Sequence, residues 1–334
     1  MSGEPRISTT DIGGDLLYYS QIYREFLQNA VNAQDASIYR ESDKRVIGKL
    51  PLMEIRGSHG VIANSLPFFG SHGGPICNTA NNFVRKLMLN ELENRIDNDQ
   101  YVSVTLIENP FFPLLPQETD SLKYFKVVDE RISQVTQLVL KDEAEKEGLL
   151  ACFHEKTRNS IRKGLKQGFM FEDATTDQDA WTYLIHEHYL GISRLGGLPK
   201  NISIFENLKL SLAQYLRLHV ARDSNGRFVA ALLSVWYGGI VEYFVPVVTI
   251  EYRESQALSA LIFEVMKEAY SQGFKIWNWG GTWLNQKGVY NFKKRFGAVD
   301  RQYRYFHWST PQFKSVPRVE LECDFPYWYS RKFD

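Results

Sequence analysis

The feature that most constrains the fold is an order of secondary-structure elements that occurs twice along the chain. In the second half, two strand-like runs, 216–222 and 228–237, flank the hairpin turn Asp223-Ser224-Asn225-Gly226. A third strand, a helix with apolar residues at helical spacing and a short closing strand follow, at 240–250, 258–269 and 275–279. This half therefore reads as hairpin, strand, helix, strand.

The first half follows the same course, although its residues are not visibly similar to those of the second. Strands are expected at 45–56 and 61–69, and a glycine loop at 70–75 leads to a helix and a closing strand at 101–108. Each half also opens with an amphipathic helix, at 16–30 and 179–191. We therefore predict a duplicated α/β unit, divided near the charged segment 141–150 into domains 1–145 and 146–334.

Length and charge agree with this organisation and limit the partners. A chain of 334 residues is long for a single core. Lys plus Arg and Asp plus Glu both total 39, so wholesale attraction to nucleic acid or to an anionic membrane is not expected. Cys77, Cys152 and Cys323 are far apart and form no CxxC pair, which excludes a disulfide framework.

Several classes of protein lack support in the sequence. The N-terminus has no apolar leader and no run approaches about 18 apolar residues, so we expect a cytoplasmic protein without a transmembrane segment. The chain contains no HExxH, Walker A or GxGxxG motif and no Ser-His-Asp order. We therefore expect no metal and no cofactor.

The order of elements resembles the GNAT acyltransferase unit, and three motifs narrow the resemblance to the FemAB/FemX aminoacyltransferases. The first is Leu66-Pro67-Phe68-Phe69 with His72-Gly73-Gly74-Pro75, and the second is the basic run 154–163. The third and most specific, Gly288–Ala298, resembles the Phe-Lys-x-x-Phe-Gly motif of that family. The resemblance implies an α/β (α+β) fold of tandem GNAT-like domains, each a mixed, mostly antiparallel sheet flanked by helices.

The resemblance also implies a reaction in which an amine attacks an activated acyl carbon. In the leading interpretation, an aminoacyl group passes from aminoacyl-tRNA to an amino group of a nucleotide-linked cell-envelope precursor, a UDP-linked amino sugar or muropeptide. One alternative is an acyl-CoA-dependent N-acyltransferase acting on an amino sugar for surface polysaccharide. Another is a ligand-binding relative that has lost the chemistry.

Lys293 is the main catalytic candidate. Helical geometry places it at the edge of an apolar stripe formed by Val289, Phe292 and Phe296. Such a lysine either extends its head to water or projects into a cleft. The resemblance implies the second, because the functional lysine of the family occupies this motif position, where it would hold a phosphate or stabilise the acyl oxyanion.

Basic residues supply the candidate substrate contacts. Arg158 and Arg162 lie four residues apart on one helical face and form either a phosphate clamp or a solvated basic helix. Arg194 is expected in a glycine-containing loop beyond the helix at 179–191, and the resemblance implies contact with the nucleotide diphosphate. Lys294 and Arg295 extend the basic patch around Lys293.

Of four further candidates, three have a structural alternative. Gly73 and Gly74 either expose backbone N–H groups that donate hydrogen bonds to an anion, or simply form a turn. Trp279 stacks on a base or packs in the core. Glu242 is nominated as general base because GNAT enzymes often keep a carboxylate on the equivalent strand.

The loop before the second-half helix favours tRNA over CoA as donor. It reads Arg253-Glu254-Ser255-Gln256-Ala257-Leu258, with no glycine and with a carboxylate. A CoA-binding loop of the Gln/Arg-x-x-Gly-x-Gly/Ala type presents N–H groups to a pyrophosphate, which this loop does not match.

Overall fold

The computed structural model describes residues 16–66, 72–77, 82–138 and 148–331. The chain forms two compact units, one comprising residues up to Ser133 and from Arg301 onward, the other comprising Gln134–Asp300. The chain passes between them inside β8 (Lys126–Gln137) and β14 (Val299–Ser309). The boundary at 145/146 refers to the two copies of the duplicated element order, and it stays a prediction.

The sheet of the second unit has the strand order β13-β12-β11-β10-β9. The predicted hairpin is present, and the Asp223 carboxylate accepts hydrogen bonds from the N–H groups of Asn225 and Arg227 in its turn. All pairs in this sheet are antiparallel except β12 with β13. The strands span β9 (Met170–Asp173), β10 (Leu216–Arg222), β11 (Phe228–Tyr237), β12 (Ile240–Val248) and β13 (Ile276–Trp283).

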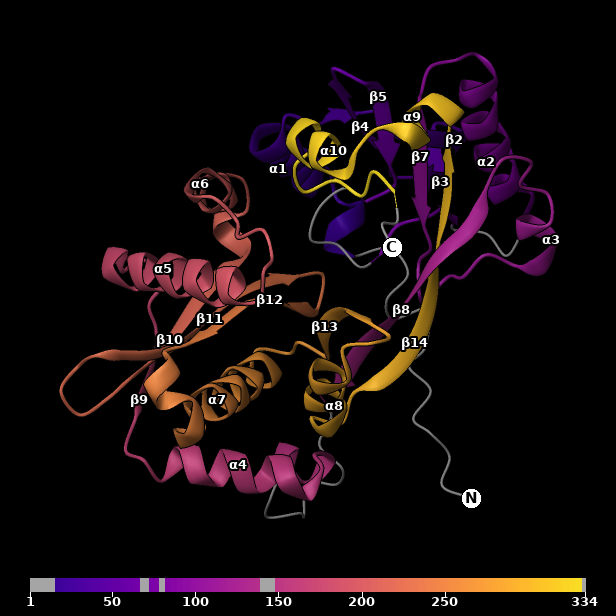
Figure 1. Cartoon of the computed structure of the whole chain (residues 1–334). Helices are drawn as coiled ribbons and strands as arrows, with labels where there is room; N and C mark the ends of the chain where they lie inside the picture. Colours follow the sequence, from indigo (N-terminus) through magenta and orange to yellow (C-terminus); the bar gives the residue numbers. More distant parts are fainter. Residues whose placement is uncertain (1–15, 67–71, 78–81, 139–147, 332–334) are drawn as a thin grey trace. The chain divides into compact units, whose positions relative to one another are not determined.

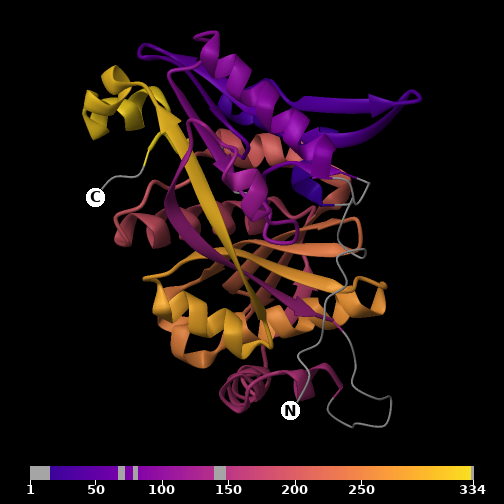
Figure 2. The same ribbon diagram turned by 90° about the vertical axis from the view of Figure 1, so that its right-hand side faces the viewer.

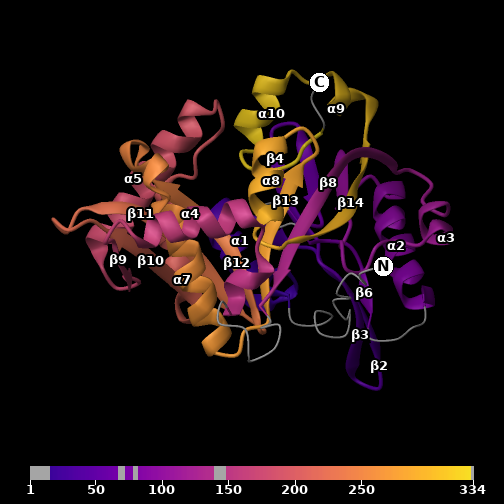
Figure 3. The ribbon, with the colours of Figure 1, turned by 90° about the horizontal axis from the view of Figure 1, so that it is seen from below.

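Helices cover both faces of this sheet (Figure 1). The predicted apolar stripe of α7 is buried against the strands, together with Trp277 and Trp279. Helix α4 lies across α7 (Figure 3), and Gly164 allows the close approach. The helices span α4 (Glu155–Leu165), α5 (Gln178–Arg194), α6 (Ile202–Ser211), α7 (Ala257–Ser271) and α8 (Lys287–Arg295).

The pairing of β12 with β13 is short. It runs from Ile240↔Ile276 to Glu242↔Asn278, although both strands continue beyond these residues. A bulge at Leu233/Ser234 in the pairing with β11 bends the same stretch of β12. The two strands thus separate just after Glu242 and Asn278, on the side where α8 follows β13.

The first unit repeats this pattern with shorter strands. Strands β4 and β5 form an antiparallel hairpin, and β7 pairs parallel with β5 after helix α2. A second sheet, β2-β3-β6, packs against α2, and its indigo hairpin extends past that helix (Figure 2). The elements are β1 (Gln34–Asp35), β2 (Ile38–Ser42), β3 (Arg45–Leu50), β4 (Met53–Gly57), β5 (Gly60–Asn64), β6 (Ile76–Cys77), β7 (Ser103–Ile107), α1 (Gln21–Val31), α2 (Asn82–Asp97), α3 (Pro116–Thr119), α9 (Pro311–Ser315) and α10 (Arg318–Asp324).

Two local predictions in this unit are wrong. The strand expected at 45–56 is two strands in different sheets, because Pro51 lacks the N–H group that a continuous ladder needs. Pro75 does not begin a helix: β6 follows it, and α2 starts at Asn82. Residues 67–71, from the predicted strand 61–69 and the glycine loop, and residues 141–147 of the charged segment lie outside the described residues.

Candidate active site

Lys293 is buried and its head points toward β13. Its Nζ donates hydrogen bonds to the Gly281 carbonyl at 3.2 Å and to Thr282 Oγ1 at 2.8 Å. The side chain is 6% exposed, and burial lowers the pKa of Lys293 to about 8. A lysine that reached for water would be exposed, so this ammonium lies inside the protein. The catalytic role of Lys293 stays a prediction. An ammonium has three N–H donors, and one remains for a ligand oxygen.

Glu242 lies at the point where β12 and β13 separate. It is 2% exposed, and Asn278 Nδ2 donates to its Oε2 at 2.7 Å. Asn278 Oδ1 in turn accepts from the Gly280 backbone N–H at 3.0 Å. Asn278 therefore links the carboxylate to the bend of β13, where Gly280 has a positive φ of 71°. The assignment of Glu242 as general base stays a prediction.

A cavity of about 300 Å³ lies among α4, the start of α7 and α8. Lys156 and Arg295 bring positive charge to it, and Ser160, Ser259 and Gln256 bring hydrogen-bonding groups. The first turn of α7 also leaves the N–H groups of Leu258 and Ser259 without backbone acceptors among the described residues. Positive side chains and a helix N-terminus together make this cavity suited to an anionic ligand.

Gln256 gives the first turn of α7 an unusual form. It adopts the left-handed conformation with φ of 66°, which usually favours glycine. Its Oε1 accepts a hydrogen bond from Ser259 Oγ at 3.2 Å, so the side chain bends back along the helix start. A ligand at this end of α7 therefore meets a glutamine side chain, where a glycine would leave the backbone bare.

The three candidate arginines have different environments. Arg158 on α4 is half-buried, and its Nη1 donates to the Phe153 carbonyl at 3.2 Å. Its Nε is buried and has no hydrogen-bond partner within the part of the chain that the structure describes. Arg162 is also half-buried, one turn further along the same helix. Arg194 is the exposed last residue of α5, so its predicted position in a loop is wrong: the helix continues past Gly191. Their roles as phosphate ligands stay predictions.

Lys294 and Trp279 have protein partners. Lys294 Nζ lies 3.1 Å from Asp300 Oδ2. Trp279 is 2% exposed, packs against Phe292 and Phe296, and donates its indole N–H to Thr136 Oγ1 at 2.9 Å. Stacking of Trp279 on a base stays a prediction, and it would require the ring to leave this cluster.

Gly73 and Gly74 belong to the first unit and are buried. A Cβ at Gly73 would lie 2.5 Å from Ser65 Oγ and 2.7 Å from the Ile107 carbonyl, so only glycine fits beside the end of β7. Both carbonyls accept hydrogen bonds from the Tyr19 hydroxyl. Close packing accounts for these glycines, and their contact with substrate stays a prediction.

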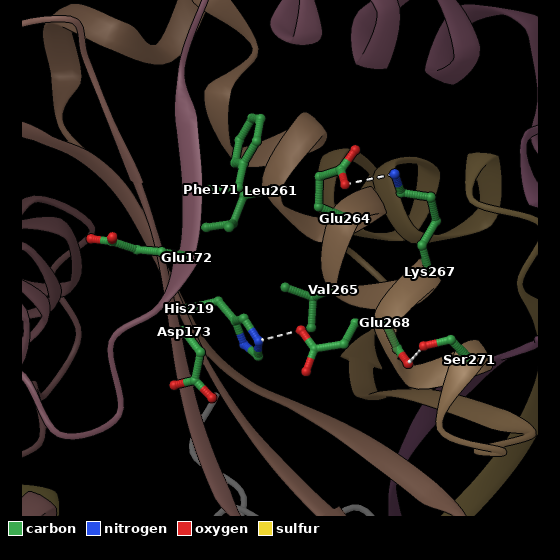
Figure 4. Close-up of a pocket in the computed structure, with 10 residues that line it drawn as sticks. All are labelled: Phe171, Glu172, Asp173, His219, Leu261, Glu264, Val265, Lys267, Glu268 and Ser271. Carbon is green, nitrogen blue, oxygen red and sulfur yellow. Dashed lines mark hydrogen bonds and ion pairs between the residues drawn. The ribbon is translucent and has the colours of Figure 1, made fainter.

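A larger cavity of about 420 Å³ lies at the other end of α7 (Figure 4). Its charged lining is mainly acidic: Glu264 is paired with Lys267 at 2.6 Å, and Glu268 with His219 at 2.9 Å. None of the candidate catalytic or substrate-binding residues predicted from the sequence lines it. This excess of carboxylates makes it unsuited to a phosphate-bearing donor.

We call the cavity of about 300 Å³ among α4, α7 and α8 the cationic cavity. The sequence did not reveal Lys156 and Ser160, which also line it, or the residues that bond Lys293. Lys156 and Ser160 lie four residues apart on one face of the basic helix, which was the available signal. Thr282 and Asn278 carry no motif, and only the fold brings them to Lys293 and Glu242.

Among the described residues, no group of His, Cys, Asp and Glu is placed to hold a metal ion. No helix in those ranges combines the length and apolarity needed to cross a bilayer.

Residues 153–294 match the family of acetyltransferase (GNAT) domains, a stretch that includes α4, the α7 cavity and Lys293. The chain therefore carries a GNAT acyltransferase domain, and the prediction of an acyltransferase is confirmed. A search of curated protein sequences gives no significant match.

Solved structures confirm the fold. FemX superposes with a TM-score of 0.69 at 14% identity, over 92% of this chain and 97% of that one. L-PGS from Bacillus licheniformis gives 0.52 at 14% identity, over 91% and 95%. A tandem GNAT protein from the clavulanic acid biosynthesis pathway gives 0.52 at 10% identity, over 88% and 97%. The predicted resemblance to the FemAB/FemX group, and the tandem GNAT-like fold, are thus confirmed at the level of architecture.

Proposed function

We propose that this chain transfers an aminoacyl group from aminoacyl-tRNA to an amino group of a nucleotide-linked cell-envelope precursor. The observation that carries the proposal is the buried Lys293 ammonium, which keeps a donor for a ligand after bonding Gly281 and Thr282. In acyl transfer, a fixed cation of this kind stabilises the oxyanion that forms when the amine attacks the acyl carbon. The same cation would hold a phosphate of the donor end.

The cationic cavity supports a nucleotide-bearing donor. Lys156 and Arg295 supply charge where the N-terminus of α7 also favours an anion. Gln256 stands where a CoA-binding loop keeps glycine, so phosphates meet side chains at this point more readily than bare backbone. This arrangement favours the acceptor end of a tRNA over the compact pyrophosphate of CoA.

The second candidate is an acyl-CoA-dependent N-acyltransferase, and the match to an acetyltransferase domain favours it. In either reaction Glu242 would accept the proton of the attacking amine, directly or through one water. The cytoplasm is the compartment in which charged tRNA and UDP-linked precursors are both available, and we propose that location.

The test is to offer charged tRNA and acetyl-CoA separately, each with a UDP-linked amino sugar or muropeptide as acceptor. Transfer of the amino acid from charged tRNA, abolished by ribonuclease, is the expected result. Product from acetyl-CoA alone, unaffected by ribonuclease, would overturn the tRNA assignment. Absence of turnover with both donors and several amines would favour a ligand-binding protein.

A further inference from the structure

The Lys293 head is held by a chain of hydrogen bonds whose direction is fixed. Thr282 Oγ1 accepts from Lys293 Nζ at 2.8 Å and donates to Gln134 Oε1 at 3.4 Å. A hydroxyl has a single proton, so when it donates to Gln134 it presents only lone pairs to the ammonium. The orientation of the Gln134 amide therefore sets whether the Thr282 proton points away from Lys293.

That orientation is set from the far side of Gln134. Its Nε2 donates to the Tyr290 carbonyl at 3.3 Å and to Asp300 Oδ1 at 3.2 Å, and neither oxygen could be a partner for the amide oxygen. The amide is fully buried, and the Tyr290 hydroxyl donates to the second Asp300 oxygen at 2.7 Å. Asp300 and the end of α8 thus fix the amide, and the amide fixes the Thr282 proton.

We infer that Thr282 and Gln134 are positioning residues that hold the Lys293 ammonium so that its remaining N–H points at the reacting group. The inference rests on the proposed role of Lys293 in acyl transfer. It assigns a function in the reaction to side chains that carry no sequence motif. The ammonium loses rotational freedom, and its two protein acceptors remain aligned before substrate arrives.

The network also affects protonation. Burial lowers the pKa of Lys293 to about 8, and an acceptor that bonds the ammonium more strongly than the neutral amine opposes that effect. The other ionisable groups around the network are Tyr290 and Lys294 on α8, Asp300, and Glu242 across β13. Loss of the Thr282 hydroxyl should therefore favour the neutral amine and lower the pKa of Lys293 further.

The experiment compares Thr282→Val with Thr282→Ser and with Gln134→Met. Thr282→Val should reduce kcat about tenfold with little change in KM, and move the alkaline limb of the rate profile to lower pH by about one pH unit. Thr282→Ser keeps the hydroxyl and should stay within about threefold of the wild type. Gln134→Met should shift the limb in the same direction, because the Thr282 proton is then free to turn toward the lysine.

Thr136→Val is the matched structural control. Thr136 lies two residues beyond Gln134 on β8, and its hydroxyl also makes two buried hydrogen bonds, from Trp279 Nε1 and to the Phe296 carbonyl. It has no hydrogen bond to Lys293, so its removal should lower Tm without moving the alkaline limb. A limb that moves equally in Thr136→Val and Thr282→Val would overturn the inference.

A second readout separates this inference from the proposed function. The Lys293 Cε resonance, assigned with Lys293→Arg, is followed by NMR as a function of pH in wild type and Thr282→Val without any substrate. A lower midpoint in the variant supports the network even if the donor assignment fails. An unchanged midpoint would contradict the inference, whether or not the protein transfers aminoacyl groups.

Discussion

The two ends of α7 carry cavities of opposite character. At the N-terminal end, Lys156 and Arg295 lie near the N–H groups of Leu258 and Ser259, which have no backbone acceptor among the described residues. At the C-terminal end, Glu264 and Glu268 are the prominent groups. The acidic cavity is the larger, about 420 Å³ against about 300 Å³. Cavity size therefore does not distinguish the two ends as binding sites. The sign of charge and the helix direction favour the N-terminal end for a phosphate-bearing ligand.

The largest effect is expected from Lys293→Ala. This substitution tests whether the reaction takes place beside α8, near the N-terminal end of α7. We expect a loss of at least about a hundredfold in kcat/KM, because the oxyanion loses its buried cation. Tm should change little, since the lysine contributes charge more than packing and its removal eliminates a buried charge. Steady-state kinetics and calorimetry give the two values.

The control for Lys293→Ala is Glu268→Gln in the acidic cavity. It should leave kcat/KM within about threefold of the wild type. Loss of activity in Glu268→Gln with full activity in Lys293→Ala would reverse the assignment of the two ends.

The next effect concerns charge in the cationic cavity. Lys156→Ala and Arg295→Ala should each raise the apparent KM for the donor about tenfold, with a weaker dependence on salt than in the wild type. Arg158→Ala and Arg194→Ala test the sequence-based assignments in the same assay and should weaken donor or acceptor binding. Calorimetric titration with donor and with acceptor checks each variant. A residue whose replacement leaves the affinity for both ligands unchanged does not belong to the site.

The sequence predicted the second unit better than the first for identifiable reasons. Strands 216–222 and 228–237 are mostly apolar, buried runs on either side of a turn that contains Gly226, so local pattern suffices there. Strand β8 carries charged and polar residues such as Asp129, Gln134 and Thr136 and gives no apolar alternation, so it was missed. Its partners are distant in sequence, and only tertiary structure reveals them.

The candidate site was predictable where a motif exists and not elsewhere. Lys293 was nominated through the family motif, because helical spacing alone left open whether its head extends to water or enters a cleft. Thr282 and Gln134 are 148 residues apart, so no spacing rule could join them to the lysine. Trp279 was nominated by its aromatic ring alone, and the structure gives that ring a core environment.

A smaller effect is expected from the contact that shapes the cationic cavity. A Cβ at Gly164 would lie 2.5 Å from the Gln256 carbonyl and 2.8 Å from Ala260 Cβ. Gly164→Ala should therefore push α4 away from α7, cost about 1–3 kcal/mol of unfolding free energy and weaken donor binding. Denaturant unfolding and donor titration measure the two.

Gly191→Ala is the matched control for this contact. Gly191 lies within α5, and a Cβ there would meet nothing within 4 Å. The substitution should raise stability by about 0.5–1 kcal/mol and leave donor binding unchanged. Destabilisation by Gly191→Ala as large as that by Gly164→Ala would mean that helix propensity, and not the α4–α7 contact, governs both.

The smallest effect lies in the acidic cavity and follows from its His219–Glu268 pair. The hydrogen bond from His219 holds the pKa of Glu268 below its ordinary value of 4.5, and burial opposes it. A lowered carboxyl pKa contributes stability above the unfolded pKa and loses it as pH falls through the folded one. The Glu268 side chain is 36% exposed, so solvent screening limits the contribution to under about 1 kcal/mol.

Wild type should thus exceed Glu268→Gln in unfolding free energy at pH 6. The difference should shrink as pH falls below about 4.5, and also in about 1 M salt. Urea unfolding across this range checks it; a difference that grows on acidification would show that the pair is not held by the ionised carboxylate.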